Sequence, residues 1–380
     1  MIHVDDTNDR YHRQNLITWW DQSKLSSARV LVVGAGAIGN EVVKNLALVG
    51  IGHISIVDMD LIEHSNLARC VFFREVHEGR PKAVVLAEEA KALNPDVDAI
   101  GLNLPVQRLG AAYLRRFDIV VGALDNREAR AWVNQAARKL GINWIDAAIE
   151  GLRGLVRMFS SEGPCYACTL TDSDWQQMAH RKSCALLAPE EILSGKTPTN
   201  ATTAGVVAGI QVQETIKFLV GNEELLSLLG KCWVFTGDTM ISYVTSYQED
   251  PNCLAHDTYG DLSEFSGVKF SDAVALANDR KDFVPYAVDF EEELVSLEAC
   301  KNCGSQEGKK TRFRSALNLG DGRCGRCGAE LPAELWTSVD VNHPVLEQLI
   351  TEVGFGIEDV LTIRSEGNER AHYLIKAGNR

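Results

Sequence analysis

ARVLVVGAGAIGNEVVKNLALVGIGHISIVDMD, residues 28–60, is the stretch that decides the fold of this chain. Its residues 30–33 form a short run of β-branched and other apolar side chains. Gly34, Gly36 and Gly39 follow that run in G-x-G-x-x-G spacing. This order predicts a strand that enters a tight turn and then a helix.

The turn and the helix after it predict a binding site for a nucleotide. Apolar residues recur at helical spacing over residues 38–49, and residues 53–57 resume a strand that ends at Asp58. A helix that begins on an uncrowded glycine backbone points free N–H groups at an anion, so we expect a phosphate at residues 36–40. A ribose hydroxyl is then expected beside Asp58.

The residues after Asp58 favour a triphosphate over a nicotinamide cofactor. Glycine spacing alone leaves hydride transfer and adenylation open, and an NAD-dependent oxidoreductase is the default interpretation of such a turn. Here a second acid, Asp60, is followed by Asn66, Arg69 and Lys82. Arginine and lysine neutralise charge on phosphoryl oxygens, and a carboxylate can hold Mg²⁺. This cluster therefore indicates an enzyme that handles a triphosphate.

Strands and helices continue to alternate, which predicts an α/β fold. The apolar run at residues 117–124 is typical of a central parallel strand and ends at Asp125 and Asn126, where open α/β sheets bind ligands. The other expected elements are helices at residues 81–93, 127–140 and 202–221, and strands at residues 99–104, 143–149 and within 231–247. They predict a doubly wound, Rossmann-like mixed sheet, interrupted by a long irregular connection at residues 151–203.

The sequence pattern changes near residue 259, which predicts two domains, at residues 1–259 and 260–380. The second is expected to be a small α+β domain. Its expected elements are helices at residues 270–277 and 345–353, a strand at residues 290–297, and two strands in the last thirty residues.

Composition excludes several classes of protein. The 380 residues are 45% hydrophobic and 24% charged, as in ordinary globular proteins. The N-terminus has no secretory pattern and no run reaches the roughly 18 apolar residues of a membrane span, so we expect a cytoplasmic protein. A formal net charge of −14 argues against a general nucleic-acid binder, which needs a broad basic face.

Seven motifs resemble those of a known family in their order and spacing. They are RYHRQ, GAGAIG, IVDMD, SNLAR, GRPKA, ALDNREAR and NATTAGVVAGIQVQETIK, within residues 10–256. The chain is thereby similar to the superfamily of ThiF, MoeB and the ubiquitin-activating enzymes. The resemblance implies that ATP and Mg²⁺ are bound and that the C-terminal glycine carboxylate of a ubiquitin-like protein attacks the α-phosphate. Pyrophosphate then leaves and an acyl adenylate remains.

Carried over position by position, the resemblance assigns a role to each polar residue of the cluster. The ribose-binding acid falls on Asp60, and the acid associated with Mg²⁺ falls on Asp125. The phosphate contacts fall on Asn66, Arg69 and Lys82. Two anions, a carboxylate and a triphosphate, have to meet in this reaction, so cations and a metal must lower their repulsion.

Two other positions are informative. One concerns the assembly of subunits, and at the other this chain differs from the family. Arg13, in RYHRQ, resembles the arginine finger that reaches the partner subunit's active site in dimeric members, so we expect a homodimer. Cys70 stands where the family commonly has Gln, and we expect a small packed side chain there.

Most of the ten cysteines fall into patterns typical of zinc ligands. Two knuckles that match a zinc ribbon are formed by Cys300, Cys303, Cys324 and Cys327. A second, mixed set pairs a C-x-x-C with a C-x-x-H, where related enzymes place the second half of a structural site: Cys165, Cys168, Cys253 and His256. Each set offers the four ligands of a closed tetrahedral Zn²⁺ site, which leaves no open position for catalysis.

Cys184 distinguishes the hypotheses about function. It follows Cys168 by sixteen residues, and in enzymes that activate ubiquitin and its relatives a catalytic cysteine lies at a similar distance. The leading hypothesis is therefore an activating enzyme that adenylates a ubiquitin-like protein, binds it to Cys184 as a thioester and transfers it to a conjugating enzyme, with the second domain as a partner-binding site. The alternatives are a sulfur-carrier adenylyltransferase of the thiamine or molybdopterin type, without a thioester, and a non-catalytic scaffold.

Overall fold

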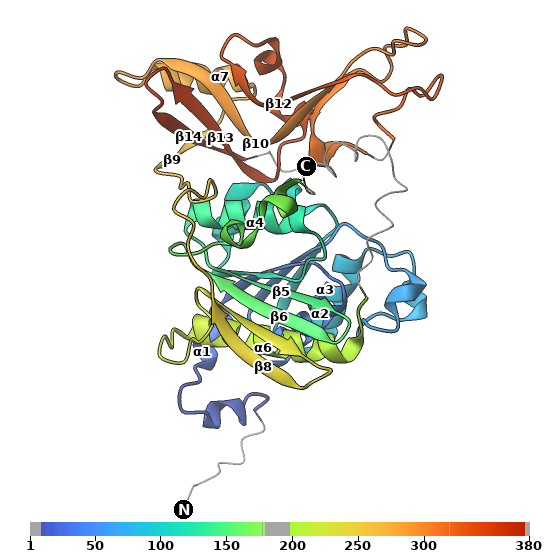
Figure 1. Cartoon of the computed structure of the whole chain (residues 1–380), viewed down its shortest axis with the longest axis vertical. Coiled ribbons are helices and arrows are strands. Elements are labelled where there is room, and N and C mark those ends of the chain that lie inside the picture. Colours follow the sequence, from blue (N-terminus) through green and yellow to red (C-terminus); the bar gives the residue numbers. More distant parts are fainter. Residues whose placement is uncertain (1–8, 177, 179–197, 319, 377–380) are drawn as a thin grey trace, which may run out of the picture. The chain divides into compact units, whose positions relative to one another are not determined.

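The structure is a computed structural model that describes residues 9–176, 178, 198–318 and 320–376. These residues divide into two compact units, drawn in Figure 1. Unit 1 comprises residues 9–106, 115–169 and 198–256. Unit 2 comprises residues 107–114, 170–176, 178, 257–318 and 320–376, so it takes in a short piece of chain that comes long before residue 259.

Unit 1 is built on an eight-stranded mixed sheet with the order β3-β2-β1-β4-β5-β6-β7-β8. The parallel strands are β1 (Arg29–Val33), β2 (His53–Val57), β3 (Asp98–Leu102), β4 (Ile119–Gly122) and β5 (Trp144–Glu150). The antiparallel strands are β6 (Arg153–Phe159), β7 (Lys231–Thr236) and β8 (Ile241–Ser246). This α/β sheet confirms the predicted fold class for the larger part of the chain.

The order of the strands reverses between β1 and β4. Both strands consist almost wholly of buried apolar residues, as expected for central parallel strands. Val33, at the end of β1, pairs with Val57 of β2 on one side and with Gly122 of β4 on the other. Open α/β sheets bind ligands beyond the carboxyl ends of the strands at such a switch.

Helices cover both faces of this sheet, as Figure 1 shows. One face shares a core with α2 (Ala37–Leu48), α3 (Lys82–Leu93) and α6 (Ala201–Val220), near the short α1 (Gln22–Ser27). The opposite face carries α4 (Arg127–Leu140). The helices predicted at residues 81–93, 127–140 and 202–221 are confirmed to within one residue at each end.

The prediction of an irregular connection from residue 151 is wrong at its start, because β6 lies there. The strand has the sequence RGLVRMF, in which Arg157 interrupts the apolar residues. Arg157 is nevertheless buried, since it pairs with Asp146 of β5. Gly154 lets α6 approach, because a Cβ at this position would lie 2.3 Å from Cγ2 of Val207.

Unit 2 contains a six-stranded sheet with the order β11-β10-β13-β14-β9, and β12 pairs with β10. Its strands are β9 (Leu262–Phe265), β10 (Pro285–Leu297), β11 (Lys310–Phe313), β12 (Ala333–Asp340), β13 (Glu358–Ser365) and β14 (Arg370–Lys376). Four phenylalanine rings pack edge to face or tilted in its core, at Phe270, Phe290, Phe313 and Phe355.

Some of the elements predicted for unit 2 are confirmed and one is wrong. The helix predicted at residues 270–277 is α7 (Phe270–Asn278), and the last two strands are β13 and β14. The helix predicted at residues 345–353 is instead a 3-10 turn at Pro344–Glu347 followed by α8 (Ile350–Val353). Gly354, with φ of 83°, ends that short helix.

Residues 107–114 connect β3 to β4 but pack within unit 2. Asp359 Oδ1 accepts a hydrogen bond from the backbone N–H of Ala111 at 3.1 Å, and Arg108 Nη1 donates to the Gly354 carbonyl at 2.9 Å. Ala112 is buried in a small apolar cluster with Val360 and Leu374. Among the described helices of the whole chain, none combines the length and the apolar character that crossing a bilayer requires.

Candidate functional site

The three glycines after β1 have different structural tasks. Gly34 has φ of 103°, and a Cβ there would lie 2.4 Å from the Ala123 carbonyl oxygen. A Cβ on Gly39 would lie 2.0 Å from the carbonyl oxygen of Gly34. A Cβ on Gly36 would meet no described atom within 4 Å. Gly34 and Gly39 are thus needed by the fold itself, whereas Gly36 faces open space at the start of α2.

This open turn has the properties of an anion site. α2 begins at Ala37 with Gly36 as its N-cap residue, and no described side chain caps its first turn. The N–H groups at the start of a helix favour a negatively charged ligand such as a phosphate. The predicted phosphate position at residues 36–40 is therefore available in the structure.

Asp58 shapes the turn through both of its carboxylate oxygens. Oδ2 accepts a hydrogen bond from the Ala35 N–H at 2.7 Å, and Oδ1 accepts one from the Asp60 N–H at 2.8 Å. Burial raises the pKa of the Asp58 carboxyl, although these two backbone hydrogen bonds and Lys82 oppose the shift. Asp58, which we expected beside the ribose, thus joins the glycine turn to the loop after β2.

Lys82 brings a cation to the same loop. It is the first residue of α3, and its Nζ lies 2.8 Å from Oδ2 of Asp60. Burial opposes the charged form of Lys82, but the hydrogen bond to Asp60 and the charge of Asp58 outweigh burial, so its pKa is raised. The lysine is therefore a permanent cation held by the acids of residues 58–60.

The segment after Asp60 is folded by Asn66. Its Oδ1 accepts from the backbone N–H of Glu63 at 2.9 Å, and its carbonyl accepts from the N–H groups of Arg69 and Cys70. The side chain of Arg69 forms no hydrogen bond or ion pair with another described residue. Cys70 is buried, and burial raises its pKa to about 11, so it is the packed thiol expected from the sequence.

Asn40 joins this segment to the glycine turn, a role that we did not expect from the sequence. The residue is fully buried in α2. Its Nδ2 donates to the carbonyls of Ala35 and Gly36, at 2.9 and 3.1 Å. Its Oδ1 accepts from the Phe72 N–H at 3.2 Å. The loop that carries Asn66 and Arg69 is thereby fixed against the turn that would hold the phosphate.

Asp125 and Asn126 lie on the neighbouring turn, after β4. Asn126 caps α4, because its Oδ1 accepts from the Ala129 N–H at 2.7 Å. Asp125 is exposed, and its Oδ1 lies 3.4 Å from Nδ2 of Asn126. Since Gly34 packs directly on Ala123, the glycine turn and the Asp125 turn leave adjacent strands side by side.

Among the predicted site residues that the structure describes, Arg13 is not brought to this turn. Arg13 is exposed on the N-terminal segment, and its side chain makes no hydrogen bond or ion pair with another described residue. That segment is docked through Tyr11, whose hydroxyl accepts from Asn94 Nδ2 at 2.8 Å. Cys184 lies outside the described residues.

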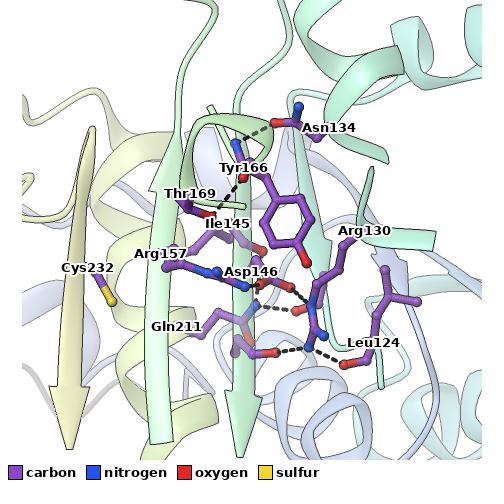
Figure 2. A network of polar contacts seen from close by, with 12 residues as sticks. Leu124, Arg130, Asn134, Ile145, Asp146, Arg157, Tyr166, Thr169, Gln211 and Cys232 are labelled. Carbon is purple, nitrogen blue, oxygen red and sulfur yellow. Dashed lines mark hydrogen bonds and ion pairs between the residues drawn. The ribbon is translucent and has the colours of Figure 1, made fainter. Parts of the chain in front are cut away.

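A network of buried charges, drawn in Figure 2, reaches the carbonyl of Leu124, the residue before Asp125. Asp146 of β5 is fully buried and pairs with two arginines, Arg130 of α4 and Arg157 of β6. Sequence analysis did not single out any of the three residues. Their only sequence feature is that Arg130 ends the ALDNREAR motif.

The mixed set of cysteines and histidine comes together in unit 1. Cys165 Sγ lies 3.8 Å from Cys168 Sγ and 3.7 Å from Cys253 Sγ, and His256 Nε2 lies 3.2 Å from Cys168 Sγ. All four ligand atoms lie within 4.8 Å of one another. On the other side of the ring, His256 Nδ1 lies 3.2 Å from a carboxylate oxygen of Glu249, which can orient the imidazole.

The four cysteines of the expected ribbon come together in unit 2. Cys300 Sγ lies 3.6 Å from Cys327 Sγ, and Cys303 Sγ lies 3.6 Å from Cys324 Sγ. The apolar cluster around them has few other members, chiefly Val295, Leu297 and Leu331. Sulfur atoms bound to one tetrahedral Zn²⁺ at about 2.3 Å are about 3.8 Å apart, so the spacing in both sets fits that ion.

Comparison with known proteins shows that the chain is similar to several enzymes. The chain is 32% identical over 239 residues to the "SAMP-activating enzyme E1" of Haloferax volcanii. This alignment covers 61% of this chain and 81% of that protein. It is 39% identical over 171 residues to the "Sulfur carrier protein adenylyltransferase" of Thermus thermophilus. That alignment covers 42% of this chain and 63% of that protein.

The chain is also similar to solved structures. The crystal structure of E. coli MccB with ATP matches with a TM-score of 0.56 and 26% identity, over 67% of this chain and 75% of that chain. A family model described as "ThiF family" matches residues 11–255, which include the glycine turn, Lys82, Asp125 and the three cysteines of the mixed set. On these grounds we assign the chain to the ThiF family.

Proposed function

We propose that this chain uses ATP and Mg²⁺ to adenylate the C-terminal carboxylate of a ubiquitin-like carrier protein. The observation that carries the proposal is the open turn at Gly36, with the cation Lys82 and the acids of residues 58–60 on one side and Asp125 on the other. The names of the relatives, an E1 and a sulfur-carrier adenylyltransferase, support the same class of reaction.

Each residue has a physical task in this reaction. A carboxylate oxygen of the carrier attacks the α-phosphorus of ATP, and the bond from that phosphorus to the pyrophosphate oxygen breaks. Lys82 and Arg69 neutralise charge that grows on phosphoryl oxygens, while Asn66 and Asp60 orient the nucleotide. Mg²⁺ would supply further positive charge, with Asp125 as its carboxylate partner.

Loss of pyrophosphate exchange in Asp125→Ala tests this proposal. Removing one preorganised electrostatic group, such as an oxyanion-hole donor, from an active site costs about 10² to 10³ in rate. We therefore expect carrier-dependent exchange of labelled pyrophosphate into ATP to fall by about that factor. Asp238→Ala is the matched control, because Asp238 is an exposed acid that follows β7 of the same sheet. Equal exchange in both variants would refute the metal-site assignment.

The fate of the acyl adenylate depends on Cys184. In our proposal its thiolate displaces AMP, which forms a thioester that is then passed to a conjugating enzyme. Wild-type enzyme with ATP, Mg²⁺ and carrier should yield a complex that survives a denaturing gel and disappears with a thiol reductant. Cys184→Ala should lose this complex and keep pyrophosphate exchange. A wild type that exchanges pyrophosphate but never forms the complex would favour the sulfur-carrier alternative.

The proposal extends to assembly and to the second domain. Arg13 is exposed and its side chain makes no hydrogen bond or ion pair among the described residues, which is compatible with action on the partner subunit of a homodimer. Sedimentation at working concentration should give twice the chain mass, and a monomer would remove this role of Arg13.

Residues 260–380 would bind the conjugating enzyme. We also propose that the two cysteine sets each hold one Zn²⁺ with a structural role.

A further inference from the structure

The parallel pairing of β4 and β5 ends just before the turn that carries Asp125. The last paired residues are Gly122 of β4 and Asp146 of β5. Near this end, Gln211 of α6 donates from Nε2 to the Gly122 carbonyl at 2.8 Å and to the Ile145 carbonyl at 3.1 Å. One side chain thus bridges the two strands where their own hydrogen bonds stop (Figure 2).

Arg130 bridges the same two strands again, two residues farther along each. Its Nη2 donates to the Leu124 carbonyl, beyond the end of β4, and to the Ala147 carbonyl of β5 at 3.2 Å. Its Nε donates to Asp146 Oδ1 at 3.0 Å. The guanidinium therefore continues the link after the backbone ladder has ended. Leu124 is the residue directly before Asp125.

Asp146 fixes the direction of Arg130. The acid is fully buried and also accepts from Arg157, whose guanidinium carbon lies 4.8 Å from the ring centre of Tyr166. Burial opposes the charge of Arg157, but Asp146 outweighs it and raises the pKa of the arginine. Apolar side chains of similar volume often stabilise a fold as well as buried ion pairs do, so stability alone does not account for this set.

We propose that Arg130, oriented by Asp146, is a positioning residue that holds the Asp125 turn in the geometry needed for ATP and Mg²⁺. Arg130 is buried and bonds to the backbone behind the turn, so it acts through Asp125 and not on the nucleotide. The inference rests on the proposed function, because it takes Asp125 to be the Mg²⁺ partner. A displacement of about 1 Å in a catalytic group can cost about 10²-fold in rate, so a fixed turn matters.

The test compares two buried arginines of the same helix. Arg130→Lys keeps a positive charge, but one ammonium does not reproduce the forked contacts with Asp146 and two carbonyls. Arg138→Lys is the matched control, because Arg138 is as buried as Arg130 and also donates to two carbonyls, those of Ser160 and Gly163. The measurement is the affinity of the full chain for ATP, with MgCl₂ and with EDTA.

We expect the wild type to bind ATP more tightly with MgCl₂ than with EDTA. Arg130→Lys should lose about tenfold or more of this Mg²⁺-dependent gain, whereas Arg138→Lys should keep it, even if both variants unfold at lower temperature. Asp125→Ala should lose the gain, and adding Arg130→Lys to it should cost little more, because both changes act on one contact.

The outcomes separate the two proposals. A wild type with no Mg²⁺-dependent binding of ATP would refute the proposed function. A wild type that binds, together with an Arg130→Lys variant that behaves like Arg138→Lys, would refute the positioning role alone. Additive losses in the double variant would also refute it. Should Arg130→Lys fail to fold, Arg157→Lys decides, because it leaves the bonds of Arg130 to both carbonyls and weakens the support of Asp146. A loss of about threefold supports the role, and no loss overturns it.

Discussion

The polar groups that unit 1 buries and those that unit 2 buries hold different parts of the chain. In unit 1, Asn40, Gln211 and Arg130 bond to the backbone at or just beyond the carboxyl ends of parallel strands. In unit 2, Asp359 bonds to the backbone of residues 107–114, and Glu292 bonds to Ser315. Damage to the first group should therefore appear in ligand binding, and damage to the second in folding.

Substitutions in the glycine turn should have the largest effect, and two of them should act differently within unit 1, one on ATP binding and one on stability. Gly36→Ala should fold, because its φ of −76° suits any residue and its Cβ meets no described atom. The added methyl should instead meet the nucleotide and weaken ATP binding by about tenfold or more. Gly39→Ala forces a Cβ onto the Gly34 carbonyl and should destabilise the protein by about 1 to 3 kcal/mol or more.

Thermal unfolding and ATP titration of both variants check this pair. The expected result is a normal melting temperature with weak binding for Gly36→Ala, and a lowered melting temperature for Gly39→Ala. If Gly36→Ala bound ATP like the wild type, the open turn would not be the phosphate site.

Metal content tests the cysteine cluster of unit 2. We expect two Zn²⁺ per chain by elemental analysis, and one in Cys303→Ser, because a tetrahedral site that loses a thiolate binds zinc poorly. The apolar cluster around these cysteines is small, so the variant should also lose part of the unfolding transition of unit 2.

ATP affinity supplies the control for that experiment. Cys303 lies in unit 2, and we place the nucleotide site in unit 1, so ATP binding by Cys303→Ser should match the wild type. Binding that fell together with the metal content would contradict the separation of tasks between the two units.

The smallest expected effect is a dependence of unit 2 on pH. Asp359 retains some exposed surface, yet burial of its carboxyl raises its pKa to about 7, and Glu291 and Glu292 add to the shift. Between about pH 4 and pH 7 the unfolded chain loses this proton while the folded chain keeps it. Stability should therefore fall as pH rises through this window and stay low above it.

Asp359→Asn isolates this contribution, because the amide oxygen can still accept from Ala111 while the titration disappears. The wild type should melt several degrees lower at pH 8 than at pH 5.5, and the difference should shrink in the variant. An unchanged difference would assign the pH dependence to other groups.

What the sequence predicted correctly depends on local patterns. The glycine turn, the helices of unit 1 and the strand before Asp125 follow from apolar periodicity and from glycine and cap residues close in sequence. β6 was missed because Arg157 breaks its apolar pattern, and its burial depends on Asp146, eleven residues earlier in the chain. Arg130 was missed for the same reason, since a buried arginine and an exposed one look alike in a helical pattern.

Residues 107–114 bear on how this protein could have been assembled or could be divided. Leu109, Ala111, Ala112 and Leu114 are buried, and the piece of chain that contains them belongs to the unit formed mainly by residues beyond 256. A protein shortened after residue 256 would therefore carry an uncovered apolar strip between β3 and β4. Solubility would suffer even with the ATP turn intact. The two units are consequently not interchangeable modules, and a chimera that keeps one of them has to redesign this strip.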